Sequence, residues 1–123
     1  MKLRIRGNSL RLRLTRGEVE QLATEHQVEE SVTFGPGVSL TYAIACREVP
    51  SPVAAFDGTK IVVSCPPALV SSWARSEEVG FEAEQSVGEG KVLRILVEKD
   101  WNCLTSRPGE EDIDTFPNPH KSC

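Results

Sequence analysis

Residues 2–14 read KLRIRGNSLRLRL, and residues 53–65 read VAAFDGTKIVVSC. In each stretch, two short runs of alternating side chains flank a turn that contains glycine, which is typical of a β-hairpin. The second stretch begins about fifty residues after the first, and the pattern that follows the first hairpin also follows the second. A repeat of this length indicates one supersecondary unit used twice.

Each of these hairpins is followed by an amphipathic helix and then by a second hairpin. The expected helices cover residues 15–26 and 66–77. Thr15 and Glu18 form a capping box at the start of the first helix, and the pair 66–67 supplies proline to the first turn of the second. The second hairpins turn at Gly35-Pro36-Gly37 and at Gly88-Glu89-Gly90.

These elements predict an α+β fold in a single domain, residues 1–106, built from an internally duplicated ββαββ unit at 2–48 and 53–100. Its eight strands are mainly antiparallel, because hairpins join them, and two helices pack on them. Such strands could close into a barrel or stack as two layers, and the pattern leaves both open. Residues 107–123 are an acidic, proline-rich tail without apolar periodicity, from which we expect little stability.

Turn length fixes which residues face each other across a hairpin. A two-residue turn at Gly7-Asn8 places Leu3 opposite Leu12 and Arg4 opposite Arg11. For the hairpin at 53–65, a type I′ turn at Asp57-Gly58 predicts the pairs Phe56 with Thr59 and Ala54 with Ile61.

Composition indicates an ordinary soluble domain. The chain has 123 residues, 39% of them hydrophobic and 26% charged, and a net charge of −4. That size can bury a core without metal or disulfides, and the acidic balance argues against a nucleic-acid partner. There is no signal-peptide pattern and no membrane-length apolar run, so we expect a cytoplasmic protein with no membrane partner. Its cysteines would then be thiols.

Three stretches resemble a family of short, uncharacterised bacterial proteins. They are RGNSLRLRLT at 6–15, ILVEKDWNCL at 95–104 and FPNP at 116–119. The resemblance extends over nearly the whole chain and implies a stand-alone bacterial protein. It brings no activity, cofactor, partner or site residue with it.

The first hairpin carries the main candidate site, a basic face made of Lys2, Arg4, Arg6, Arg11 and Arg13. Like charges that face each other across strands destabilise a sheet, so something must offset them. One account is a bound anion, such as a phosphate held by guanidinium groups. The other is acidic partners on neighbouring strands, drawn from Glu29, Glu82, Glu84 and Glu98. The second account is favoured, because charged strand faces are commonly only solvated.

Glu30 is a second candidate, because it shares the inward strand phase of Val28 and Val32. A buried carboxylate is costly unless it is paired, and such groups often mark sites. A local bulge that turns Glu30 outward is the favoured alternative. His26 is expected at the end of the first helix, where a positive charge suits the helix dipole.

The sequence predicts no metal, cofactor or catalytic residue. Cys103, His120 and Cys123 could bind a metal, but their spacing is irregular and whether they do so stays open. No phosphate-binding glycine loop or nucleophile elbow occurs. We therefore expect a non-enzymatic binding or interaction module whose partner is a small anion or a protein. The alternative is an enzyme or sensor for a phosphorylated anionic ligand on the basic hairpin. A concave arginine face would favour a ligand.

Overall fold

The computed structural model of the protein describes residues 1–101, which form eight strands and two helices. In chain order these are β1 (Lys2–Arg6), β2 (Ser9–Leu14), α1 (Arg16–Glu25), β3 (Gln27–Gly35), β4 (Val38–Cys46), β5 (Val53–Phe56), β6 (Lys60–Cys65), α2 (Pro67–Arg75), β7 (Gly80–Gly88) and β8 (Lys91–Lys99). The tail predicted at 107–123 lies outside the described residues.

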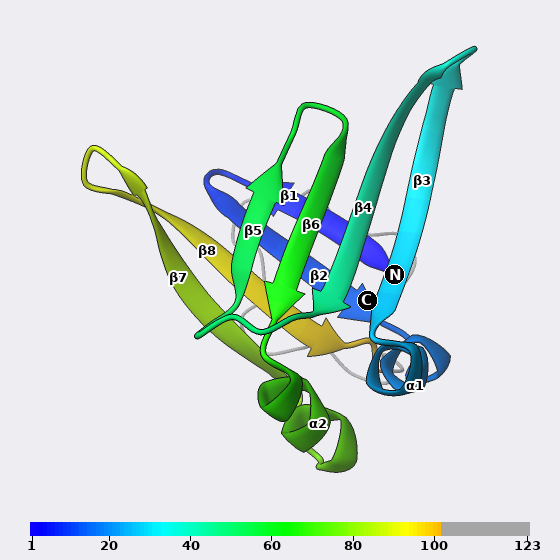
Figure 1. Ribbon diagram of the computed structural model, residues 1–123, viewed down its shortest axis with the longest axis vertical. Coiled ribbons are helices and arrows are strands. Elements are labelled where there is room, and N and C mark those ends of the chain that lie inside the picture. The colour runs from blue at the N-terminus through cyan, green and yellow to red at the C-terminus, as the bar shows by residue number, and fades with distance from the viewer. Residues whose placement is uncertain (102–123) are drawn as a thin grey trace, which may run out of the picture.

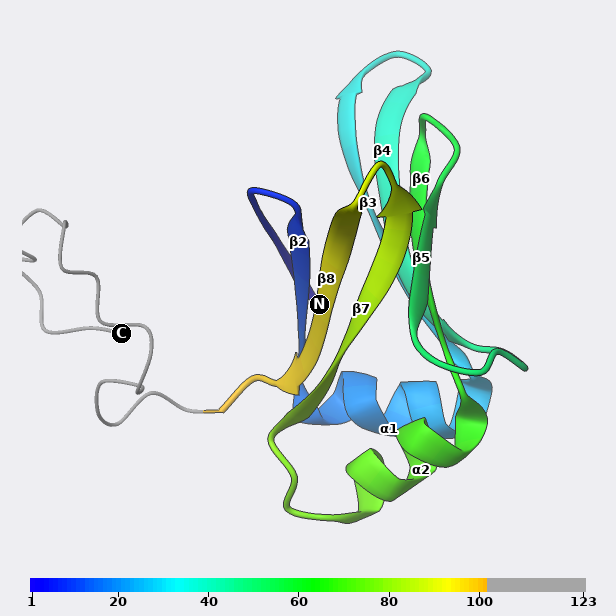
Figure 2. The same ribbon diagram turned by 90° about the vertical axis from the view of Figure 1, so that its left-hand side faces the viewer.

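The strands form two open four-stranded sheets, ordered β1-β2-β8-β7 and β3-β4-β6-β5 (Figure 1). The sheets stand side by side as two layers, with both helices at one end (Figure 2). The α+β expectation is therefore confirmed in its two-layer form, without a closed barrel. Each hairpin is antiparallel, but the central joins β2·β8 and β4·β6 are parallel, so both sheets are mixed. Every sheet combines one hairpin from each half of the chain.

The register of the first hairpin is confirmed, with Leu3 opposite Leu12 and Arg4 opposite Arg11. The register predicted for β5 and β6 is wrong by two residues: Phe56 faces Ile61, and Ala54 faces Val63. The reason is the Asp57 side chain, whose Oδ1 accepts hydrogen bonds from the backbone N–H groups of Thr59 (2.9 Å) and Lys60 (2.8 Å). Asp57 thus opens the turn instead of occupying its centre. A slip of two residues leaves each side chain on its expected face.

The helix starts follow the sequence. The capping box of α1 is confirmed: the Thr15 hydroxyl accepts from the Glu18 N–H at 3.3 Å, and the Glu18 carboxylate accepts from the Thr15 N–H at 2.9 Å. Val19 and Leu22 are buried, whereas Ala23 is exposed. His26 ends the helix in the left-handed conformation (φ 67°) and leaves its side chain exposed.

The core lies between the sheets and extends to the helices. Its largest fully buried side chains include Trp73, Leu12, Leu14, Leu22, Ile44 and Ile95. The Trp73 ring meets Phe81 edge-on at 5.3 Å, and its Nε1 donates to the carbonyl of Val79 at 3.2 Å. Because alternate side chains of β2 and β8 fill this core, the intervening ones stand on the outer face of their sheet.

Candidate functional site

The predicted basic face forms on the outer side of the first sheet. Strand pairing there aligns side chains in three rows across β1, β2, β8 and β7. The rows are Arg6, Ser9, Arg94, Glu84; then Arg4, Arg11, Leu96, Glu82; then Lys2, Arg13, Glu98, Gly80. Positive charge therefore gathers toward the β1 edge and negative charge toward the β7 edge.

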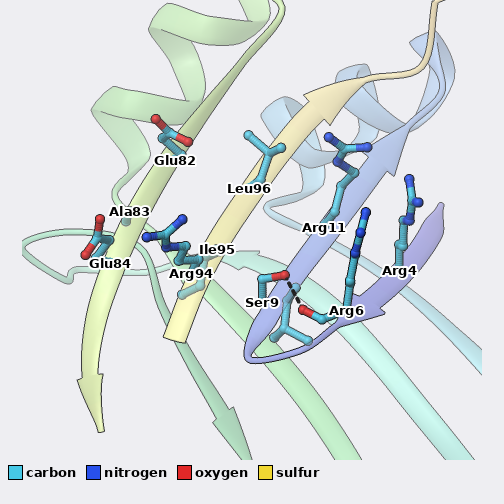
Figure 3. Close-up of a pocket in the computed structure, with 11 residues that line it drawn as sticks. Arg4, Arg6, Ser9, Arg11, Glu82, Ala83, Glu84, Arg94, Ile95 and Leu96 are labelled. Atoms are coloured by element: carbon cyan, nitrogen blue, oxygen red, sulfur yellow. Dashed lines mark hydrogen bonds between the residues drawn. The ribbon is translucent and has the colours of Figure 1, made fainter. Parts of the chain in front are cut away.

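The first two rows line a hollow of about 700 Å³, which we call the outer hollow. Arg4, Arg6 and Arg11 form one side of it, the arginine wall (Figure 3). Glu82 and Glu84 on β7 form the opposite side, the glutamate wall. The arginine face is thus concave, which favours a bound ligand.

The third row is neutralised within the protein. The Nε atom of Arg13 lies 2.6 Å from Glu98 Oε1, and that of Arg11 lies 3.5 Å from the same oxygen. The Lys2 ammonium lies 3.1 Å from Asp100. Acidic partners, the favoured account from sequence, therefore exist for this row and for Arg11 of the second row. Of the four acids proposed from the sequence, only Glu98 forms an ion pair with the basic face within residues 1–101. Glu29 pairs instead with Lys60, at 2.6 Å.

Among the described residues, the other arginines of these rows have no such partner. Within residues 1–101, no carboxylate forms an ion pair with Arg4, Arg6 or Arg94. The hydroxyl of Ser9 donates to the carbonyl of Arg6 at 2.6 Å, so it closes the hairpin turn. The five predicted basic residues consequently divide into a paired set around Glu98 and Asp100 and a pair, Arg4 and Arg6, that faces the outer hollow.

Glu30 takes the inward phase and lies opposite Tyr42, because the bulge of this hairpin lies further on, between Thr33 and Gly35. The favoured outward turn is therefore wrong. The carboxylate is nevertheless only partly covered, with 41% of its side chain exposed. It lies 2.9 Å from the α-ammonium group of Met1 and accepts a hydrogen bond from the Tyr42 hydroxyl at 2.8 Å. Glu30 thus ties the start of β1 to the opposite sheet.

The Met1 ammonium group is shared with Glu18 of α1. Burial alone would lower the pKa of this amine, but its hydrogen bonds to Glu18 and Glu30 outweigh burial and raise it. Burial would likewise raise the pKa of Glu18, but the bonds to the ammonium and to Thr15 lower it. For Tyr42, burial and the bond to Glu30 both raise the pKa. Both shifts favour the charged forms of the Met1 ammonium and the Glu18 carboxylate, which together tie the start of β1 to α1.

A second side chain, which the sequence analysis missed, joins the opposite edges of the sheets. The Gln85 side chain on β7 accepts from the Ala54 N–H at 2.7 Å and donates to the Ala54 carbonyl at 3.0 Å. It thereby supplies both hydrogen bonds that a neighbouring strand would give to β5. The sequence held a signal for this contact: Gln85 falls on the same inward strand phase as Phe81 and Ala83, and a polar group on that phase requires a hydrogen-bond partner.

Both cysteines within residues 1–101 lie in or against the hydrophobic core. Cys46 and Cys65 are neighbours on the parallel strands β4 and β6, and both are free thiols. Burial raises the pKa of Cys46, and burial with the nearby Cys46 raises that of Cys65 to about 12. Within residues 1–101, no three His, Cys, Asp or Glu side chains gather as a metal site would require. Cys103, His120 and Cys123 lie outside that range.

Comparison with known proteins yields a single result. A family model described as a family of unknown function, DUF7009, matches residues 1–120. No curated protein and no solved structure matches the chain. Neither helix in the described part of the chain is long and apolar enough to cross a membrane.

Proposed function

We propose that this chain, which belongs to the DUF7009 family of unknown function, is a non-enzymatic binding protein for a small phosphorylated or otherwise anionic ligand. The ligand would occupy the outer hollow, with its anionic group on the arginine wall. As the sequence suggested, we place the protein in a bacterial cytoplasm, where Cys46 and Cys65 stay reduced.

The observation that carries this proposal is the concave placement of Arg4 and Arg6. Their guanidinium groups line a hollow whose volume, about 700 Å³, falls in the range of small-molecule sites. No carboxylate of residues 1–101 pairs with them. Arg4 also stands opposite Arg11, which pairs with Glu98 at 3.5 Å, and an anion between the two arginines would relieve the repulsion that remains. Guanidinium groups bind phosphate oxygens in bidentate fashion, which gives affinity and orientation together.

The lining favours binding over catalysis. Among the described residues around the hollow, Ser9 carries the sole hydroxyl, and no histidine or cysteine is present. The Ser9 proton is directed to the carbonyl of Arg6, so no base withdraws it. This arrangement supports a protein that holds its ligand unchanged.

Thermal denaturation with added phosphate tests the proposal, at ionic strength matched with sodium chloride. A ligand that binds only the native state raises the melting temperature by mass action. We expect millimolar phosphate or pyrophosphate to raise it, and the double substitution Arg4→Gln, Arg6→Gln to abolish the rise. Arg47→Gln, an exposed arginine outside the lining, is the matched control and should respond like the wild type.

The ligand-free variants supply an independent check. Because Glu98 already pairs with Arg11, removing Arg4 relieves only part of the repulsion, so Arg4→Gln should melt at or slightly above the temperature of the wild type when no anion is present. A flat response to phosphate, sulfate, pyrophosphate and nucleotides would refute the proposal and leave the interaction-module account of the sequence.

A further inference from the structure

The outer hollow is electrically polar across its width. Arg4, Arg6 and Arg11 line it on β1 and β2, whereas Glu82 and Glu84 line it on β7 (Figure 3). Arg94 of β8 also lines it, next to Glu84, so the charge changes sign most clearly in the second row. In the second row the apolar side chain of Leu96 separates Arg11 from Glu82. A site built for an anion alone would gain nothing from this second wall, because its negative charge repels such a ligand.

Within the described part of the chain, no cationic side chain forms an ion pair with the glutamate wall. Glu82 and Glu84 are exposed, and within residues 1–101 neither forms an ion pair. Glu84 lies opposite Arg94 in the strand register but makes no ion pair with it. Both walls therefore present charge to the same hollow, and a ligand can meet both at once.

We infer that the ligand is a linear molecule with an anionic group at one end, a cationic group at the other and an apolar segment between them. This inference rests on the proposed function, since it takes the arginine wall as the anion site. Neighbouring strands lie about 4.8 Å apart, so the glutamates on β7 lie about 10 Å from Arg11 on β2 and about 14 Å from Arg4 and Arg6 on β1. The apolar segment lies over Leu96.

Three alkyl phosphates test this inference by titration calorimetry. They are hexyl phosphate, 6-aminohexyl phosphate, which spans the hollow, and 2-aminoethyl phosphate, which is too short. We expect 6-aminohexyl phosphate to bind about two- to five-fold tighter than hexyl phosphate, the gain of a solvent-exposed ion pair. The short amine should bind no tighter than hexyl phosphate.

The double substitution Glu82→Gln, Glu84→Gln should erase the advantage of the long amine and leave hexyl phosphate bound at least as tightly as before. Glu77→Gln, an exposed glutamate outside the lining, should keep that advantage. Arg4→Gln with Arg6→Gln should weaken both long ligands. Circular dichroism checks that each variant folds.

The outcomes separate the two ideas. If hexyl and 6-aminohexyl phosphate bind equally and both depend on Arg4 and Arg6, the bipolar ligand is refuted and the anion site stands. The same holds if 2-aminoethyl phosphate matches the long amine, or if the advantage survives without Glu82 and Glu84. If no alkyl phosphate binds, the anion site falls and the bipolar ligand falls with it.

Discussion

Glu18 should be the acidic residue on which the stability of this fold depends most. One carboxylate oxygen accepts the Thr15 N–H of the capping box, and the other binds the Met1 ammonium group. Only 17% of the Glu18 side chain is exposed. Glu18→Gln keeps an oxygen for the cap and removes the charge, so it isolates the contact with Met1.

The cost follows from the contacts that are lost. A hydrogen bond to a charged group contributes about 1.5–3 kcal/mol to stability. Glu30 remains as a second carboxylate on the ammonium, so we expect Glu18→Gln to lower the free energy of unfolding by about 1.5–2 kcal/mol, the lower part of that range. Glu18→Ala also removes the cap and should cost about 1 kcal/mol more.

The stability that Glu18 and the Met1 amine contribute should fall at both low and high pH. The folded-state pKa of Glu18 lies below its ordinary value of 4.5, so its contribution is present above that value and is lost as the pH falls through the folded pKa. The pKa of the Met1 amine lies above 8.0, so its contribution is present below pH 8.0 and is lost as the pH rises through the folded pKa.

Urea unfolding of the wild type and Glu18→Gln across this pH range measures both effects. The stability gap should be widest between about pH 5 and pH 8 and should narrow on either side. Glu20→Gln, an exposed residue of the same helix, is the control and should change stability by less than about 0.5 kcal/mol. A gap no larger than that of the control, or one that is constant from pH 7 to pH 3, would refute the reasoning.

Three further substitutions test the packing. Gln85→Leu should lower stability by about 1–3 kcal/mol and speed hydrogen exchange of the Ala54 amide, because both backbone groups of Ala54 lose their partner; unchanged exchange would contradict this role. Gly80→Ala should cost about 1–3 kcal/mol in urea unfolding or prevent folding, since its Cβ would lie 2.3 Å from the Val97 carbonyl oxygen. Gly17→Ala, inside α1 with nothing within 4 Å, should instead stabilise by about 0.5–1 kcal/mol, and two changes of the same sign would sink this comparison.

The sequence predicted what local chemistry determines. The Gly7-Asn8 turn fixed the first hairpin, and with it the pairs Leu3 with Leu12 and Arg4 with Arg11. The capping box placed the start of α1 for the same reason, since both partners lie within three residues of each other. The register of β5 and β6 failed because the Asp57 carboxylate competes for backbone N–H groups, which hydrophobic alternation does not reveal.

The candidate site depends on long-range strand pairings, and the periodicity of the sequence does not reveal which strands pair. Alternation places Arg11 and Arg13 on an outer face, but only the parallel join of β2 with β8, more than 80 residues apart along the chain, brings Glu98 to both. Arg4, one strand further out, lies beyond its reach. The partner of Glu30 is the Met1 amine, which carries no side-chain signal at all.

The two parallel pairings, β2 with β8 and β4 with β6, have a consequence for how the chain folds. Neither half of the chain forms a complete sheet by itself. One sheet consists of β1 and β2 with β7 and β8, and the other consists of β3 and β4 with β5 and β6. Such long-range pairing slows folding, because the chain loses conformational entropy in bringing distant segments together before their contacts stabilise it. Cut within residues 47–52, the chain would give two pieces that are each unable to fold alone and that assemble only by interlocking. In the intact protein, the two halves of the chain therefore depend on each other for folding, as the subunits of an obligate dimer do, but a linker joins them.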